Sequence, residues 1–151
     1  MSMSILGSGL YTITSLSGEG GAAGVPPTKP AFQQVVTFPR GEFPSQWKVI
    51  RTPQGTYILS TMGYSFTGVE EDRVNATIYE EQNQEWIFTS FEHQGKDLYA
   101  IELTDRSKAW TTDNPNANAR AVINAEPLRT TKSLPPQAFP PQLFQIQRVL
   151  E

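Results

Sequence analysis

A pattern of glycine, a short spacer, tyrosine and then alternating apolar residues occurs three times along the chain. Its copies begin with the pairs Gly9/Tyr11, Gly55/Tyr57 and Gly95/Tyr99. Each copy closes on an aromatic residue that opens another alternating run, at Trp47, Trp86 and Phe144. Self-similarity at a period of about 45 residues indicates repeated supersecondary units that bury their apolar faces against one another. The chain is therefore predicted to fold as three similar units around one core.

The units are predicted to be built from β-strands. No window shows a sustained helical period, whereas short alternating runs bounded by Gly, Pro, Asn and Asp recur throughout the sequence. We expect an all-β fold, with two or three weaker strands besides those at residues 10–16, 34–38, 47–51, 56–61, 77–80, 86–91, 98–103, 120–124 and 143–150.

These repeats, each starting and ending on a barrel-type strand, are similar to those of β-trefoils, in which six strands form a short barrel capped by three hairpins. Threefold closure leaves no long open edge and buries one apolar face of each strand. The length of 151 residues is near the usual size of one domain. The resemblance implies a single β-trefoil domain over residues 9–151, preceded by a flexible N-terminus over residues 1–8.

Composition excludes several classes of function. The chain has no cysteine, so it can form neither a disulfide framework nor a thiolate nucleophile. Its net charge is −3 and it has no Lys/Arg cluster, so the sequence predicts no basic surface that would bind nucleic acid or an anionic membrane. The N-terminal residues have no charged leader, and no segment approaches the roughly 20 apolar residues of a membrane span. We expect a soluble, cytoplasmic, monomeric protein.

The third unit is longer than the other two, with the excess in loops at residues 111–119 and 126–142. Loops of this length in a compact domain are usually functional or disordered. The second loop contains the run Thr131-Lys132-Ser133-Leu134-Pro135-Pro136. An inhibitory, substrate-like loop needs a residue for the specificity pocket of a protease, small flanking residues and a backbone already fixed in an extended shape. Lys132, its two neighbours and the prolines supply these features.

The segment from Thr130 to Ala138 resembles the reactive loop of Bowman–Birk inhibitors and of the sunflower trypsin inhibitor. In those loops Thr, Lys, Ser, a variable residue and two prolines lie between paired cysteines. The matching flanks here are Thr130 and Ala138, so rigidity has to come from the prolines and the scaffold. The resemblance leaves open a cis peptide bond before Pro135, as in the Bowman–Birk loop.

Taken as a whole, the chain resembles the mushroom β-trefoil serine protease inhibitors of the cnispin and cospin type, which are related to the mycocypins. The resemblance implies a reversible inhibitor of trypsin-like serine proteases that is not an enzyme and uses no cofactor or metal. It implies that Lys132-Ser133 is the scissile bond. The implied protease-binding residues are Thr130, Thr131, Lys132, Ser133, Leu134, Pro135 and Pro136.

Two other basic residues are secondary candidates for the residue that enters the protease. Arg129 lies in the same loop, but the threonines after it lack the stiffness of prolines. Arg40 lies in a proline-flanked turn that also fits a hairpin tip with a solvated charge.

Two further functions stay open at this stage. Gln84-Glu85-Trp86 matches the Gln-x-Trp pattern of ricin-type lectins, although that pattern is chiefly structural. Inhibition of cysteine proteases or of the Asn-specific protease legumain, as in the mycocypins, would use an asparagine loop, with candidates at Asn75, Asn83, Asn114, Asn116 and Asn118. Catalysis is not expected, because the single histidine, His93, lies in a turn and the carboxylate pairs lie in charged loops.

Overall fold

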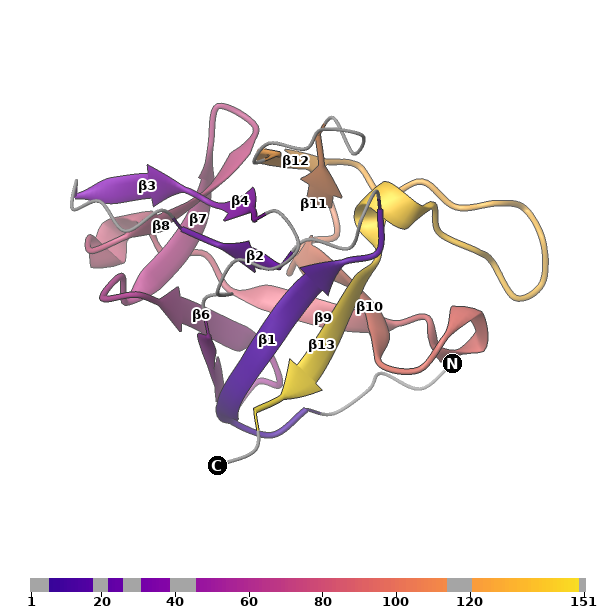
Figure 1. Ribbon diagram of the computed structural model, residues 1–151, viewed down its shortest axis with the longest axis horizontal. Helices are drawn as coiled ribbons and strands as arrows, with labels where there is room; N and C mark the ends of the chain where they lie inside the picture. Colours follow the sequence, from indigo (N-terminus) through magenta and orange to yellow (C-terminus); the bar gives the residue numbers. More distant parts are fainter. Residues whose placement is uncertain (1–5, 18–21, 26–30, 39–45, 114–120, 150–151) are drawn as a thin grey trace.

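The computed structural model describes residues 6–17, 22–25, 31–38, 46–113 and 121–149 (Figure 1). Its centre is a closed barrel in which each of six strands is hydrogen-bonded to a neighbour on both sides. The ring closes where β10 pairs with β13, at Leu98↔Gln145 and Tyr99↔Phe144. In their order around the barrel, the strands are β1 (Gly9–Ser15), β5 (Trp47–Arg51), β6 (Tyr57–Thr61), β9 (Trp86–Ser90), β10 (Leu98–Leu103) and β13 (Phe144–Arg148).

Three antiparallel hairpins cap one end of the barrel (Figure 1). They pair β2 (Ala23–Gly24) with β4 (Val36–Thr37), β7 (Phe66–Glu70) with β8 (Arg73–Thr77), and β11 (Ala109–Thr112) with β12 (Ile123–Glu126). Strand β3 (Phe32–Gln34) adds to the outer edge of β8. The described residues also include three short 3-10 helices, η1 (Glu80–Gln82), η2 (Glu92–Gln94) and η3 (Pro140–Gln142). None of the helices in these residues is long and apolar enough to cross a membrane.

The chain passes through the same order three times: a barrel strand, a cap hairpin and a second barrel strand. This is the β-trefoil fold, so the fold class predicted from the repeats is confirmed. In most of the barrel strands alternate residues face the inside, as in β1, where Tyr11, Ile13 and Ser15 are buried and the residues between them are not; β10 is instead buried at every position. Each unit thus contributes its apolar faces to one common core.

Several of the predicted strand boundaries were wrong. The run expected at residues 77–80 is instead the end of β8 followed by η1, and the strand expected at 120–124 runs over Ile123–Glu126. The sequence analysis did not place β7 or β11. Gly68 explains part of this: a side chain there would collide with the backbone oxygen of Gln82, and the glycine weakens the strand pattern.

Aromatic residues from all three units meet at the centre of the core. Trp110, on β11, is fully buried and makes edge contacts with the aromatic residue that closes each unit. Its ring centroid lies 5.6 Å from that of Trp47, 5.8 Å from that of Trp86 and 5.8 Å from that of Phe144. Edge-to-face packing at such separations is the favoured arrangement of aromatic rings. Trp110 therefore joins the three units through one side chain.

The N-terminal segment crosses the other end of the barrel. The Tyr57 hydroxyl accepts a hydrogen bond from the Leu6 backbone nitrogen at 3.0 Å and lies 2.8 Å from the Leu6 carbonyl oxygen, to which it donates. Tyr11 donates to the Gly7 carbonyl oxygen at 2.8 Å. Part of the N-terminus expected to be flexible, residues 1–5, lies outside the described residues. The segment at residues 6–8 is held by tyrosines of the barrel.

The buried Tyr57 hydroxyl predicts a pH effect on stability. Burial raises the pKa of Tyr57 above the ordinary value of 10.0, against the opposing effect of its hydrogen bond with Leu6. A raised pKa in the folded state stabilises the fold below the pKa of the unfolded chain, and this contribution disappears as the pH rises through the folded value. We expect Tyr57→Phe to lose less of its unfolding free energy between pH 9 and pH 12 than the wild type.

Urea unfolding at a series of alkaline pH values measures this difference. Tyr79→Phe is the matched control for the loss of a tyrosine hydroxyl, because the Tyr79 side chain is exposed. Equal losses in the wild type and in Tyr57→Phe would contradict the prediction.

Candidate functional site

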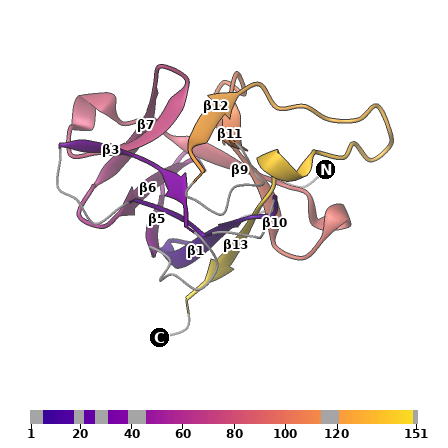
Figure 2. The same ribbon diagram turned by 45° about the horizontal axis from the view of Figure 1, so that its top comes forward.

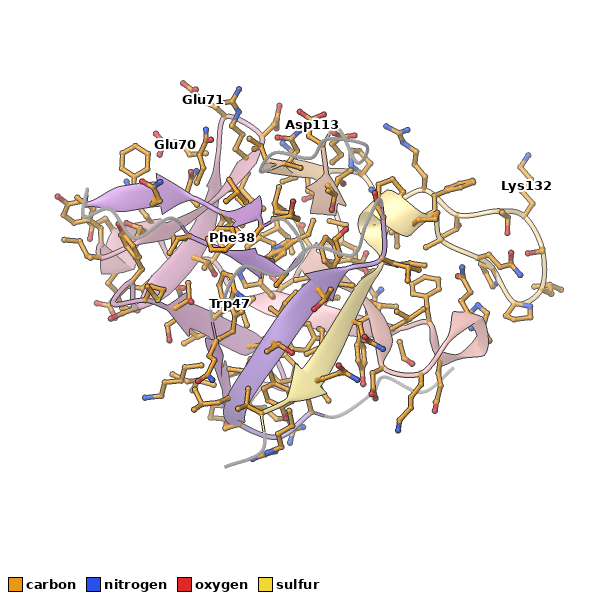
Figure 3. All side chains as sticks on the ribbon, in the orientation of Figure 1. Phe38, Trp47, Glu70, Glu71, Asp113 and Lys132 are labelled. Carbon is orange, nitrogen blue, oxygen red and sulfur yellow. The ribbon has the colours of Figure 1, made fainter. Side chains whose placement is uncertain are left out.

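The connection between β12 and β13 projects from the barrel as a long loop (Figures 1 and 2). Figure 3 shows Lys132 near the far end of this loop, with its side chain pointing away from the rest of the protein. The residues from Lys132 to Pro135 are exposed, and the Leu134 side chain is 95% accessible. The predicted specificity residue and the residues after it therefore lie where another protein can reach them.

The loop is closed at a narrow neck formed by Thr130 and Ala138. These two residues form an antiparallel β-bridge, and the Thr131 nitrogen donates to the Gln137 carbonyl oxygen at 2.9 Å. They are the positions at which the similar Bowman–Birk segment carries its paired cysteines. The Leu134-Pro135 peptide bond is cis, which is the alternative that the sequence analysis left open. Backbone pairing closes the neck in place of a disulfide.

Hydroxyl groups tie the two limbs of the loop together beyond the neck. The Gln137 nitrogen donates to Thr131 Oγ1 at 3.0 Å, and Ser133 Oγ donates to the Pro135 carbonyl oxygen at 3.0 Å. Thr131 Oγ1 and Ser133 Oγ lie 2.6 Å apart. Because a hydroxyl has one hydrogen and that of Ser133 is used, the Thr131 hydroxyl must donate to Ser133. The result is a continuous hydrogen-bond chain from Gln137 to Pro135 that links the two residues on either side of Lys132.

Gln142 holds the limb that leads into the loop, residues 127–132, which we call the first limb. Its side chain is 3% exposed, and its Oε1 accepts from the Arg129 nitrogen at 2.9 Å. Its Nε2 lies 2.9 Å from the Pro127 carbonyl oxygen and 3.0 Å from Thr111 Oγ1. The side-chain amide thus fixes two backbone groups of the first limb to β11.

A second contact holds the limb that leaves the loop, residues 133–138, which we call the second limb. It rests on η2, in the connection between β9 and β10, and the two views of the fold show this turn beside the loop (Figures 1 and 2). His93 Nε2 donates to the Pro136 carbonyl oxygen at 2.7 Å, and the Gln94 amide contacts Ala138. The sequence analysis missed His93, Gln94 and Gln142 as supports.

The two secondary basic candidates have different outcomes. Arg129 lies at the base of the first limb, where its guanidinium pairs with Glu126 Oε1 at 3.1 Å and its backbone nitrogen is bound by Gln142. The Arg129 charge is therefore paired with a scaffold carboxylate, while its side chain stays exposed. Arg40 lies outside the described residues.

The asparagine candidates for legumain inhibition gain no support. Asn75 is buried within β8, and Asn83 is partly buried with its side-chain oxygen enclosed. Neither residue lies on a projecting loop. The remaining candidates, Asn114, Asn116 and Asn118, lie outside the described residues.

The aromatic residues of the Gln-x-Trp pattern and of its Gln-x-Phe variant are part of the core. Trp86 and Phe144 are fully buried, and Gln84 Oε1 accepts from the Val69 nitrogen at 2.5 Å. Gln142 occupies the equivalent position two residues before Phe144 and binds the first limb in the same manner. The glutamines of this pattern bind backbone groups of the protein itself, which is a structural role.

Three acidic residues, Glu70, Glu71 and Asp113, lie at the cap, away from Lys132 (Figure 3). Asp72, at the tip of the β7–β8 hairpin, pairs with Lys108. Among the described residues, no group of three or more histidines or carboxylates is arranged to hold a metal ion.

Comparison with known proteins identifies the family. The sequence model of the peptidase inhibitor I66 family matches residues 3–148, which is nearly the whole chain. The chain belongs to this family. No curated protein sequence matches it. As a family member it is a protease inhibitor and not an enzyme, as the resemblance to the mushroom inhibitors implied.

Solved structures agree with the fold of an I66 inhibitor. A proteinase inhibitor from Coprinopsis cinerea superposes with a TM-score of 0.85 at 20% sequence identity, covering 95% of this chain and 99% of the other. ThreeFoil, a designed protein with threefold symmetry, superposes with a TM-score of 0.68 at 17% identity, covering 93% and 99%. The second similarity reflects the three repeated units.

Proposed function

We propose that this I66 inhibitor acts on trypsin-like serine proteases, with Lys132-Ser133 presented as a substrate-like peptide bond. The observation that carries the proposal is the position of Lys132, near the exposed end of a projecting loop whose neck is closed by backbone pairing. A protease of this class recognises a basic side chain by a carboxylate at the base of its specificity pocket. Lys132 supplies that charge.

The neighbouring residues fit the remaining positions of a bound substrate. Thr131 and Ser133 are small side chains on each side of the scissile bond, and the exposed Leu134 side chain can enter the next pocket of the protease. Binding orders little, because prolines and hydrogen bonds already restrict the loop. A contact of this kind buries roughly 800 Å² per partner.

The hydrogen-bond chain explains why the loop would inhibit instead of being consumed. Cleavage between Lys132 and Ser133 would leave the Thr131 and Ser133 hydroxyls 2.6 Å apart and both limbs bound to the barrel. The two new chain ends would stay close together, so that the peptide bond can be formed again. High effective concentration of held reactants is the physical basis of such religation.

A tight-binding titration of trypsin tests the proposal. We expect one inhibitor molecule to block one trypsin molecule, and mass analysis of the complex to find a single slow cleavage, between Lys132 and Ser133. Papain and legumain are included as other protease classes, and a sugar matrix tests lectin activity. Absence of trypsin inhibition, or cleavage at another bond, would overturn the proposal.

A further inference from the structure

We propose that Gln94 is a positioning residue for the second limb of the reactive loop and does the work of a covalent closure in this cysteine-free chain. This inference rests on the proposed function of the loop. Gln94 lies 44 residues before Ala138 in the sequence. It reaches the loop from the connection between two barrel strands, and nothing in its sequence context marks it as part of the inhibitory site.

The Gln94 side chain makes two hydrogen bonds with one residue of the neck. Its Oε1 accepts from the Ala138 nitrogen at 2.8 Å, and its Nε2 donates to the Ala138 carbonyl oxygen at 3.0 Å. A side-chain amide paired with both backbone groups of one residue imitates a neighbouring β-strand. On its opposite side, Ala138 pairs with Thr130. Ala138 is thus held between the first limb and the barrel.

Apolar packing fixes the same residue. The Ala138 side chain is 5% exposed and belongs to a small cluster, separate from the main core, against which Leu128 of the first limb also packs. The other buried members are Phe91, Leu98, Ala100 and Leu143. Phe91 and Leu98 flank the turn that carries Gln94, and the Phe91 nitrogen donates to the Leu98 carbonyl oxygen at 2.8 Å. The turn is therefore rigid enough to position the amide.

Loss of this amide should loosen the loop and leave the barrel intact. In Gln94→Ala, the Ala138 nitrogen and oxygen lose their partners while every barrel strand keeps its pairing. A looser second limb allows the new amino group of Ser133 to leave after cleavage, so the inhibitor turns into a substrate. Two lost hydrogen bonds correspond to roughly a 10- to 100-fold weaker inhibition.

The experiment measures three quantities in the wild type and in Gln94→Ala. These are the inhibition constant for trypsin, the rate of Lys132-Ser133 hydrolysis, and hydrogen exchange of the Ala138 amide. We expect weaker inhibition, about tenfold faster hydrolysis and faster Ala138 exchange, with unchanged exchange in the barrel strands. Gln94→Glu keeps the acceptor for the Ala138 nitrogen but sets a carboxylate oxygen against the Ala138 carbonyl oxygen, so it should also inhibit more weakly than the wild type.

Gln54→Ala is the matched control, because Gln54 is an exposed glutamine in the turn between β5 and β6. It should behave as the wild type. Unchanged Ala138 exchange in Gln94→Ala, or unchanged hydrolysis by trypsin, overturns the positioning role. If the wild type does not inhibit trypsin, the proposed function fails, and amide exchange alone decides whether Gln94 holds the loop.

Discussion

Replacing Lys132 by alanine is expected to weaken the inhibition of trypsin by on the order of 10³-fold or more. The ammonium group would be the one charge placed in the specificity pocket, and a central anchor of this kind can contribute about 4 to 8 kcal/mol. The Lys132 side chain makes no hydrogen bond or ion pair with the described residues, and it points away from the barrel (Figure 3). Its removal should therefore leave the free energy of unfolding unchanged. Tight-binding titration and urea unfolding measure the two quantities.

Arg129→Ala provides a control for the loss of a positive charge in the same loop. The Arg129 guanidinium pairs with Glu126 at the base of the loop, so its removal should change trypsin inhibition by less than about tenfold. Lys132→Arg retains a basic side chain and should inhibit. If Lys132→Ala inhibits within tenfold of the wild type, Lys132 is not the anchor. Papain or legumain inhibition that survives in Lys132→Ala would assign a second, separate site.

The largest expected effect on stability is that of Trp110→Ala, with a loss of about 3 to 5 kcal/mol. Trp110 is fully buried and contacts one aromatic residue from each of the three units, so its removal opens a cavity that all three border. Natural domains have only about 5 to 15 kcal/mol of stability, so the loss is a large share of the total. Urea unfolding followed by circular dichroism measures it.

Substitutions by phenylalanine separate packing from hydrogen bonding at this centre. Within the described part of the chain the Trp110 indole nitrogen is buried without a hydrogen-bond partner, whereas that of Trp47 donates to the Ala23 carbonyl oxygen at 3.0 Å. Trp47→Phe should therefore cost about 1 kcal/mol more than Trp110→Phe. A Trp110→Ala protein within about 1 kcal/mol of the wild type would show that the three units do not depend on this contact.

The repeats made the barrel predictable because each unit buries aromatic and apolar residues at corresponding positions. The tyrosine that opens a unit and the aromatic residue that closes it both lie in the core, and together with the alternating runs that follow them they located the barrel strands. Trp110 was missed since it has no counterpart in the other units and lies in a strand of only four residues. A residue that serves the junction between repeats leaves no periodic signal.

The loop was recognised from its local sequence, but its supports were not. Lys132, Ser133 and the prolines are contiguous, so a short pattern reveals them. Gln94 contributes through a contact that spans 44 residues, and a glutamine in a turn is an ordinary surface residue until the fold is known. Gln142 carried a signal, as part of Gln-x-aromatic, although its contact with the first limb required the structure. Tertiary hydrogen bonds of neutral side chains have no sequence signature.

The closed neck has a consequence for how such a protein can change over generations. Lys132 and Leu134 extend into solvent, whereas the bonds that shape the loop come from Thr130, Ala138 and the barrel. If the loop acts as proposed, a mutation at an exposed tip position would alter which protease is recognised and would place no burden on folding. Under that proposal, a lineage carrying this scaffold could acquire new target proteases by single substitutions while every intermediate sequence still folds.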